Sequence, residues 1–342
     1  MSTGYEIIKG NLNFTGPERI GLRFDRTAGI SDVYRIFVLP GESHYIEDTV
    51  YNVKKKARPV SGLKDEWGCL WASEDATGSD MGQVKNVAIA DWDDYEDYVF
   101  PDPYEPGRWE GLEEALAEAE SLGKYVQLNS PHCIFERMHF LRGFEDTLMD
   151  ILVEPDYIAD MAEKLADFQI GIIKEAHRLS NGRIHCYDTT DDWGAQKNLM
   201  ISPDSFREIF LPQYRRVFQT ARGLGMDIRF HSDGNYLEII PDLIDAGVNM
   251  LNIHQPLLMG IDNISKAGQG KVCFEVTVDI QATLPKGDKA EIEDQVKQMV
   301  EKLATPEGGL IGIEYGYLGA IGVTPEAMHY SLEMFQKYGQ FK

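Results

Sequence analysis

From about residue 111 onward, short apolar runs alternate with longer segments in which apolar residues recur every three or four positions. The short runs are typical of buried strands, and the longer segments are typical of helices with one apolar face. The predicted strands are KYVQLNSP (124–131), RIHCYDTTDD (183–192), MDIRFHSDG (226–234), VNMLNIHQP (248–256), KVCFEVTVD (271–279) and GGLIGIEYG (308–316). The predicted helices cover 111–123, 155–178, 203–224 with a kink at Pro212, 241–246, 261–267, 292–303 and 325–339.

Strands that alternate with helices in this way predict a parallel sheet with right-handed crossovers. No GxGxxG or GxxxxGK[ST] motif follows any predicted strand, which removes the usual nucleotide-binding reason for an open sheet. We therefore expect an α/β protein with a (β/α)8 TIM barrel, formed as one domain over residues 1–342. Residues 1–110 are expected to hold an N-terminal extension and the first barrel elements, and residues 111–342 the regular βα units.

The net charge of −23 argues against nucleic acid as a partner, because phosphate binding needs a basic surface. The first residues lack the features of a signal peptide, and no run approaches the roughly 20 apolar residues of a membrane span. The four cysteines are far apart and are expected to be free thiols. These features predict a cytoplasmic protein, and they leave the oligomeric state open.

Polar residues that follow barrel strands are the catalytic candidates of such a fold. Asp188, Asp191 and Asp192, followed by Trp193, either perform acid–base or metal chemistry or cap the turn before Gly194. His231 and Asp233 project to the same side of their strand and make a workable half of a zinc site.

Three further strand ends carry candidates. Asn252, His254 and Gln255 end one strand, and Glu314, Tyr315 and Tyr317 end another, while Cys273 and Glu275 lie within a third. A glutamate within an apolar strand is costly to bury without a partner. A salt bridge, a metal ion or a substrate would each meet the cost of burying Glu275 or Glu314.

At these residues the chain resembles the uroporphyrinogen decarboxylase-like family, a barrel superfamily that includes tetrapyrrole decarboxylases and corrinoid-dependent methyltransferases. The matching segments are DEWGCLW (65–71), FERMHFLRGFEDTLMDI (135–151), 188–218, 230–256 and VDIQATLPKGDKAEIEDQV (278–296). The true decarboxylases have an arginine-rich N-terminal segment that binds substrate carboxylates. Here Arg35 and Arg58 stand alone, so the resemblance favours the methyltransferase branch.

The methyltransferase branch holds zinc with an HxC segment and a distant cysteine. The first of these cysteine positions is Asp233 here, and the distal segment is Ile313–Glu314–Tyr315 without a cysteine. The resemblance thus implies a zinc ion bound by His231, Asp233 and Glu314, with Glu275 and Cys273 as substitutes. Oxygen and nitrogen ligands make such a zinc less thiophilic than a cysteine site, which favours an ether oxygen over a thiol.

The predicted function is therefore that of an O-demethylase, which takes a methyl group from a methoxylated, aromatic small molecule. The acceptor is expected to be the corrinoid (cobalamin) of a separate protein, because no corrinoid-binding domain is recognisable in this sequence. Asp192, His231 and Asp233 are the predicted catalytic residues. The predicted pocket residues are Trp193, Asn235, His254, Gln255, Tyr315 and Tyr317. A family decarboxylase and a non-catalytic small-molecule-binding barrel remain as alternatives.

Overall fold

The computed structural model describes residues 2–41, 64–72 and 83–341. Within these residues a nine-stranded sheet has the order β2-β1-β11-β10-β9-β8-β7-β6-β3, and every pairing in it except β1–β2 is parallel. The strands are β1 (Gly21–Phe24), β2 (Ile30–Ser31), β3 (Val33–Phe37), β6 (Tyr125–Asn129), β7 (Cys186–Thr190), β8 (Asp227–His231), β9 (Met250–Ile253), β10 (Cys273–Val276) and β11 (Leu310–Ile313).

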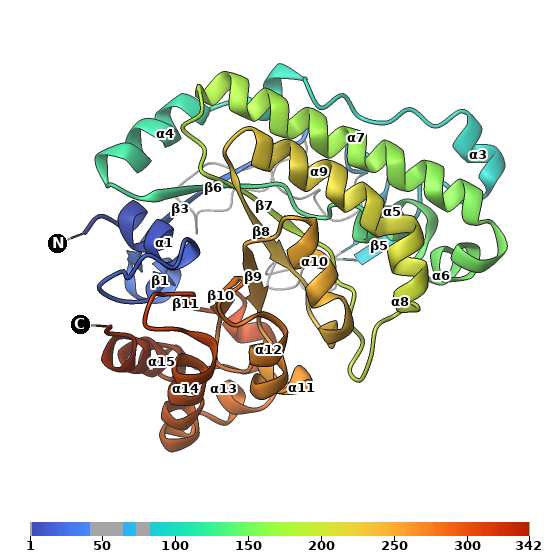
Figure 1. The fold of residues 1–342 in the computed structure, drawn as a ribbon. Coiled ribbons are helices and arrows are strands. Elements are labelled where there is room, and N and C mark those ends of the chain that lie inside the picture. The colour runs from blue at the N-terminus through green and yellow to red at the C-terminus, as the bar shows by residue number, and fades with distance from the viewer. Residues whose placement is uncertain (1, 42–63, 73–82, 342) are drawn as a thin grey trace.

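The sheet curves until β1 and β3, the first and last of its parallel strands, lie beside each other (Figure 1). Asp32 joins these ends, because its N–H donates to the carbonyl of Leu22 (2.8 Å) and its carbonyl accepts from the N–H of Tyr125 (2.9 Å). The eight parallel strands of the described residues therefore form a (β/α)8 barrel, as the sequence predicts.

Helix α1 (Gly4–Leu12) covers the N-terminal end of the barrel. Ile8 and Leu12 of this helix pack in one cluster with residues that begin strands, among them Tyr125, Cys186 and Cys273. The close approach of α1 requires glycine at position 21, where a Cβ atom would lie 2.6 Å from the Ile8 side chain. Since this end is filled, a ligand has access from the opposite, C-terminal end.

The structure has helices at all seven predicted positions, and it adds helices at 135–142, 144–153, 256–259 and 283–286 that the sequence does not predict. The helices after residue 111 include α4 (Leu112–Ser121), α5 (Phe135–Arg142), α6 (Phe144–Val153), α7 (Pro155–Ser180), α8 (Pro203–Ser205), α9 (Leu211–Gly223), α10 (Ile240–Ala246), α11 (Pro256–Met259), α12 (Ile261–Gly268), α13 (Thr283–Lys286), α14 (Lys289–Leu303) and α15 (Pro325–Tyr338). The irregularity predicted at Pro212 appears as a π-helical segment, Phe206–Phe210, which joins α8 to α9. Proline has no N–H to continue the regular helical hydrogen bonds, so the backbone bonding changes just before it.

Most of the elements before residue 111 that the sequence does not predict lie in the long connection between β3 and β6. It contains the hairpin of β4 (Leu70–Ala72) and β5 (Gln83–Asn86) and the short helix α3 (Trp92–Glu96). The short helix α2 (Asp25–Ala28) follows β1.

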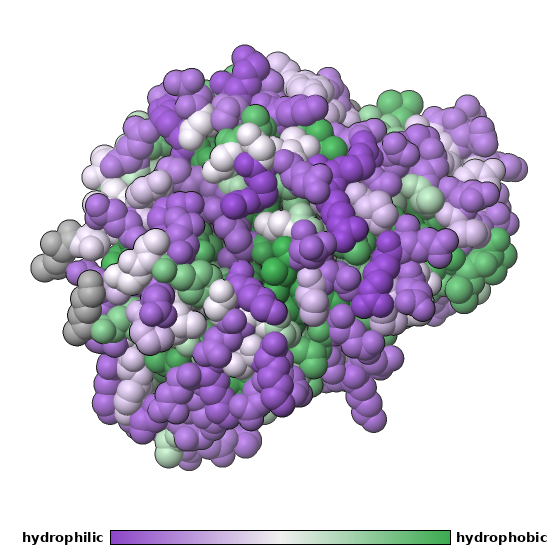
Figure 2. Space-filling view, viewed as in Figure 1, coloured by the Kyte–Doolittle hydropathy of each residue, from purple (hydrophilic) through white to green (hydrophobic). Residues whose placement is uncertain are grey.

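Most of the surface seen in Figure 2 is hydrophilic, as expected from the composition, with an apolar patch over the position of α6. That patch corresponds to the exposed side chains of Phe144, Met149, Leu152 and Val153. Every helix in the described part of the chain is too short or too polar to cross a membrane.

Candidate active site

A cavity of about 560 Å³ opens at the C-terminal ends of the barrel strands. This size is within the range of small-molecule sites, and this end of a TIM barrel is where catalytic residues lie. Arg23, Arg35 and Arg229 line its deepest part, because they project inward from within β1, β3 and β8. Residues that follow the strands line the rest, among them His132, Glu136, Thr190, Asp192, His231, Asp233 and His254.

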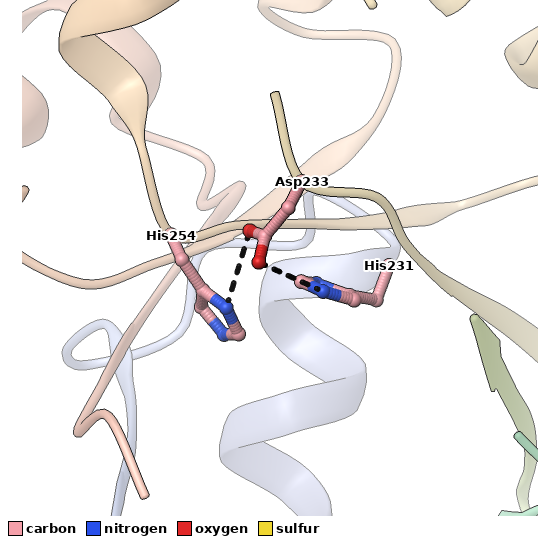
Figure 3. Close-up of side chains that lie close together, drawn as sticks. All are labelled: His231, Asp233 and His254. Atoms are coloured by element: carbon pink, nitrogen blue, oxygen red, sulfur yellow. Dashed lines mark ion pairs between the residues drawn. The ribbon is translucent and has the colours of Figure 1, made fainter. Parts of the chain in front are cut away.

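His231, Asp233 and His254 form a compact cluster on the wall of this cavity (Figure 3). The Asp233 carboxylate lies between two imidazole rings, with Oδ2 3.8 Å from Nε2 of His231 and Oδ1 3.5 Å from Nδ1 of His254. One ligand atom from each of the three residues lies within 4.8 Å of the other two. The structure therefore brings together the predicted pair, His231 and Asp233, and adds His254 as the third member.

The pairing of β8 with β9 explains why His254 joins the other two. In this parallel pair His231 lies opposite Asn252. Asp233 and His254 each follow two residues later, so they continue the same register on the same side. The predicted barrel makes these two consecutive strands neighbours, but the sequence does not show how they are aligned.

The separations in the cluster fit a bound cation better than direct hydrogen bonds. Hydrogen bonds between N and O span about 2.7–3.2 Å, whereas ligands of a tetrahedral zinc with bonds of about 2.0–2.1 Å lie roughly 3.3 Å apart. Oδ1 of Asp233 and Nδ1 of His254 are buried atoms that have no hydrogen-bond partner among the described residues. Two imidazoles and a carboxylate are also a donor set that divalent cations accept. The residues present therefore fit a zinc ion.

Asp192 lies beside the cluster, since its Oδ1 accepts the N–H of Asp233 (2.8 Å) and is 3.7 Å from Nε2 of His231. Two glycines allow the loops after β7 and β8 to approach this closely. Gly234 has φ +78°, and a Cβ atom there would lie 2.0 Å from the carbonyl oxygen of Gly194. The N–H of Gly194 donates to the carbonyl of Asp233 (3.2 Å), which joins the two loops.

The electrostatics of the cluster favour cation binding. Burial lowers the pKa of His231 to about 4, so its imidazole is neutral near pH 7, as a metal ligand must be. Burial opposes ionisation of Asp233, but the facing His231 and His254 outweigh it and lower the pKa of this carboxyl. Burial and the carboxylates of Glu136 and Asp233 raise the pKa of Asp192 well above its usual value. A cation beside Asp233 would relieve this repulsion and favour ionised Asp192.

Two predicted metal ligands lie outside the cluster. Glu314 is buried, and its carboxylate accepts the N–H groups of Arg26 (2.5 Å) and Thr27 (2.7 Å) in α2. Cys273 begins β10 and is buried among apolar side chains at the N-terminal end of the barrel, which α1 covers. Glu314 and Cys273 therefore do not lie beside His231 and Asp233, and the third residue that the structure brings to this pair is His254.

Glu275, the other predicted substitute, lies within a layer of buried charges. Its carboxylate accepts from Nε of Arg229 (2.6 Å) and Nε of Arg23 (3.3 Å). Arg229 also donates to Asp188 (2.6 Å), which in turn accepts from Arg35 (2.9 Å). The salt bridge left open by the sequence is therefore the role of Glu275. Arg35 does not stand alone but belongs to this layer, while Arg58 lies outside the described residues.

The comparison with known families decides how this barrel is classified. The family model described as uroporphyrinogen decarboxylase (URO-D) matches residues 78–338, which is more than half of the chain. The chain belongs to the uroporphyrinogen decarboxylase family. A search of curated proteins found no match.

The fold of this uroporphyrinogen decarboxylase family member is shared by a solved methyltransferase structure. A methyltransferase from Methanosarcina mazei superposes with a TM-score of 0.62 at 13% identity, over 98% of this chain and 86% of that protein. An intracellular xylanase from Thermoanaerobacterium saccharolyticum has a TM-score of 0.38 at 12% identity, over 61% of this chain and 71% of the xylanase. The M. mazei likeness confirms the TIM barrel.

Trp193 does not line the cavity, contrary to the prediction. Its side chain is fully buried, its Nε1–H donates to the hydroxyl of Tyr214 (3.0 Å), and its ring stacks on Phe135 at 4.2 Å. Asn235 is also absent from the lining, since its side chain donates to the carbonyl of Lys197 (3.0 Å). Both residues hold the loops that carry Asp192 and Asp233 rather than face a ligand.

The other predicted pocket residues divide into two groups. Tyr315 and Tyr317 line the cavity, and the Tyr315 ring meets the His254 ring edge-on at 5.3 Å. Gln255 lies outside the lining, where its Oε1 accepts the N–H of Gly234 (2.7 Å) and supports the turn after Asp233. Tyr315 and Tyr317 thus place two aromatic rings near the cluster, while Gln255 acts through the backbone.

The segment DEWGCLW forms an aromatic wall of the cavity. Asp65 organises this segment, because its carboxylate accepts from the N–H groups of Trp67 (3.0 Å) and Cys69 (2.9 Å) and from Nε1 of Trp71 (2.8 Å). The aromatic residues that line the cavity are Phe37, Trp67, Trp71, Phe140, Phe168, Tyr315 and Tyr317. Most of this wall escapes the sequence reasoning, although DEWGCLW stands out as a segment of the family resemblance.

Sequence reasoning also missed a second polar group in the cavity, formed by His132, Glu136 and Thr190. His132 follows β6, Thr190 ends β7, and Glu136 lies in the first turn of α5. The signal in the sequence is the segment PHCIFERMH (131–139), which places His132 and Glu136 directly after the predicted strand KYVQLNSP.

Proposed function

We propose that this protein is a metal-assisted methyltransferase that takes a methyl group from a methoxylated aromatic small molecule and passes it to a separate corrinoid protein. The observation that carries the proposal is the His231–Asp233–His254 cluster in the mouth of a barrel of this family. The M. mazei protein of the same fold is a methyltransferase, which is the activity class proposed here.

In this proposal His231, Asp233 and His254 would hold zinc. Asp192, which lies beside them, would be a further oxygen ligand or would orient the donor. The ligands are nitrogen and oxygen, without the thiolates that suit a thiol substrate. A zinc ion held there supplies Lewis-acid activation of an ether oxygen, which makes the departing phenolate a better leaving group.

The cavity supports an aromatic donor. Its volume of about 560 Å³ suits a single-ring or two-ring molecule, and aromatic side chains supply faces and edges for a flat ring.

A polycarboxylate tetrapyrrole fits less well, because the arginines of the cavity are engaged with acidic side chains. Arg108 pairs with Glu66, and Arg229 pairs with both Glu275 and Asp188. Guanidinium groups engaged in this way are less suited to bind a set of substrate carboxylates. The paired arginines thus favour methyl transfer over decarboxylation of a polyacid.

Metal content tests the first part of the proposal. We expect about one zinc per chain after loading and dialysis, and loss of that zinc in His231→Ala and in His254→Ala with circular dichroism unchanged. His329→Ala is a matched control, because His329 is an exposed histidine of α15. Stoichiometric zinc in both cluster variants would place the metal elsewhere. Full activity of zinc-free protein would overturn the mechanism.

A panel of methyl donors tests the substrate class. With the corrinoid partner present, we expect cobalt methylation from methoxyarenes and none from methanol or methylamines. Asp233→Cys is expected to slow ether cleavage, because a thiolate donates more charge and makes the metal a weaker Lewis acid. If methanol were the best donor, or if the Asp233→Cys variant cleaved ethers at the wild-type rate, the proposed donor chemistry would be wrong.

A further inference from the structure

The cavity contains a second connected polar group, separate from the His231–Asp233–His254 cluster. It consists of His132, Glu136 and Thr190. The imidazole Nδ1 of His132 is 3.3 Å from Oε1 of Glu136. The other carboxylate oxygen of Glu136 accepts from the Thr190 hydroxyl (2.8 Å), and the oxygen of that hydroxyl accepts the backbone N–H of His132 (3.0 Å). The Thr190 hydroxyl therefore holds the backbone of His132, while the Glu136 carboxylate faces the ring at ion-pair distance.

The backbone of His132 is in an unusual conformation. Its φ is +59°, in the left-handed region that is strained for a residue other than glycine. Among the described residues, only Phe14 and Asn181 share a positive φ without being glycine. Such strain is retained where the surrounding structure requires it, and here it turns the His132 side chain into the cavity.

The His132 ring has one buried edge and one accessible edge. Nδ1 is buried and faces Glu136, yet the side chain as a whole is 28% exposed and lines the cavity. The accessible part is consequently the edge away from Nδ1. An imidazole held in this way, with a carboxylate at one nitrogen and a ligand space at the other, has the arrangement of a general acid–base group.

Glu136 is suited to hold the ring. Burial opposes its ionisation, but His132 and the Thr190 hydroxyl outweigh it and lower the pKa of Glu136 to about 2. The carboxylate is therefore ionised near neutral pH. Asp191 accepts the N–H groups of Ile134, Phe135 and Glu136, which fixes the first turn of α5 and with it the position of Glu136.

We infer that His132 is a catalytic general acid that protonates the leaving oxygen of the methyl donor, with Glu136 as its positioning residue. This inference rests on the proposed function. The methyl C–O bond breaks and its electron pair stays on the oxygen, while the reduced cobalt of the corrinoid supplies the pair for the new bond to carbon. The proton passes from the accessible nitrogen of His132 to the oxygen, and solvent then returns a proton to the ring.

The dependence of rate on the leaving group tests this inference. The donors are 4-cyanoanisole, anisole and 4-methylanisole, and the acceptor is chemically reduced cobalamin. We choose His132→Asn because asparagine tolerates a left-handed backbone better than most residues. General acid catalysis contributes about 10²–10⁴-fold. We therefore expect kcat for 4-methylanisole to fall about 100-fold in His132→Asn and kcat for 4-cyanoanisole to fall less than about tenfold, with KM unchanged.

Two further variants separate this role from a structural one. Glu136→Gln should reproduce the leaving-group pattern with a smaller loss. His139→Gln is the matched control, because this histidine of α5 packs among Phe135, Phe140 and Phe144 and lies outside the cavity lining. It should leave the leaving-group dependence as in the wild type. Zinc content should be unchanged in all three variants.

The possible failures are distinguishable. An equal loss of kcat for all three donors in His132→Asn, or a change confined to KM, would overturn the role of His132 while leaving the proposed function in place. A wild-type protein that demethylates none of the donors would overturn the proposed function and this inference with it.

Discussion

Replacing Arg229 with methionine tests whether the buried ion pairs of Arg229 with Asp188 and Glu275 stabilise the fold. Arg229 lies two residues before His231 on β8 and bridges Asp188 and Glu275. The side chains of Asp188 and Glu275 are 0% exposed, and that of Arg229 is 4% exposed. In Arg229→Met, Glu275 keeps Arg23 at 3.3 Å and Asp188 keeps Arg35 at 2.9 Å.

The expected cost follows from this burial. Removing one partner of a buried ion pair costs about 3–5 kcal/mol, because the remaining charge stays out of water. An unfolding entropy of about 2.1 cal/mol/K per residue gives this 342-residue chain a decrease of about 4–7 °C in melting temperature. Arg215→Met is the matched control, since Arg215 pairs with Asp245 on the surface, where side chains are 42% and 71% exposed. Its cost should be below about 1 kcal/mol.

The destabilisation caused by Arg229→Met should depend on pH, because the pKa of Glu275 depends on Arg229. Burial opposes ionisation of Glu275, but Arg229 and Arg23 outweigh it and lower the pKa of this carboxyl to about 2. A carboxyl with a lowered pKa stabilises the folded state above its unfolded pKa, and the contribution disappears as the pH falls toward the folded pKa. Without Arg229, Glu275 takes up a proton more readily. The difference in stability between wild type and variant should therefore narrow from about pH 6 to about pH 3.

Thermal and urea unfolding of both variants at several pH values measure this difference. Zinc content of the Arg229→Met protein, measured where it is folded, shows whether the layer also supports the cluster. A loss no larger than that of Arg215→Met, or a deficit equally large at all pH values, would refute the assignment of Glu275 and Asp188 as structural partners of Arg229.

Two other predictions concern the loops and the partner. Gly234→Ala should weaken zinc binding and destabilise the protein more than Gly225→Ala. Both positions have a positive φ, but of the two only Gly234 has a neighbouring atom that a Cβ would strike, at 2.0 Å. Equal effects of the two substitutions would contradict the loop contact. Methyl transfer to the corrinoid protein should slow as salt rises from roughly 10 mM to several hundred mM, whereas transfer to free cobalamin should change little. A rate to the corrinoid protein that is indifferent to salt would exclude a charge-guided complex.

The barrel was predictable because its strands and helices each carry a local pattern. Apolar runs of strand length, such as the one that becomes β10, alternate with amphipathic segments such as the one that becomes α14. The strands β1 and β3 escaped assignment because only a short irregular connection separates them, so the alternation that marks the later units is missing. Helix α5 has almost no apolar periodicity, since it carries polar residues into the cavity.

The candidate site was only partly predictable because its members meet through register and loop contacts. His231 and Asp233 share one strand end, and their spacing is visible in the sequence. Whether a residue of the neighbouring strand joins them depends on how the two strands are aligned and on the loops that follow them. Trp193 illustrates the opposite error, because an indole beside three aspartates resembles a pocket residue although its ring packs among Phe135, Phe206 and Phe210.

The residues of the His231–Asp233–His254 cluster differ from the cysteine ligands that the family resemblance implies, and this difference bears on the proposed chemistry. The family resemblance places a cysteine at position 233 and another near the last strand, and this chain has neither. The structure supplies a substitute from a different strand, since His254 of the β9 end completes a three-member cluster with His231 and Asp233. A site that had merely lost its ligands would not place another imidazole 3.5 Å from the carboxylate, with both facing atoms buried and without hydrogen bonds among the described residues. Under the proposed function, a metal at this position would have harder ligands than thiolates, and such a cation acts more strongly on an ether oxygen than on a thiol.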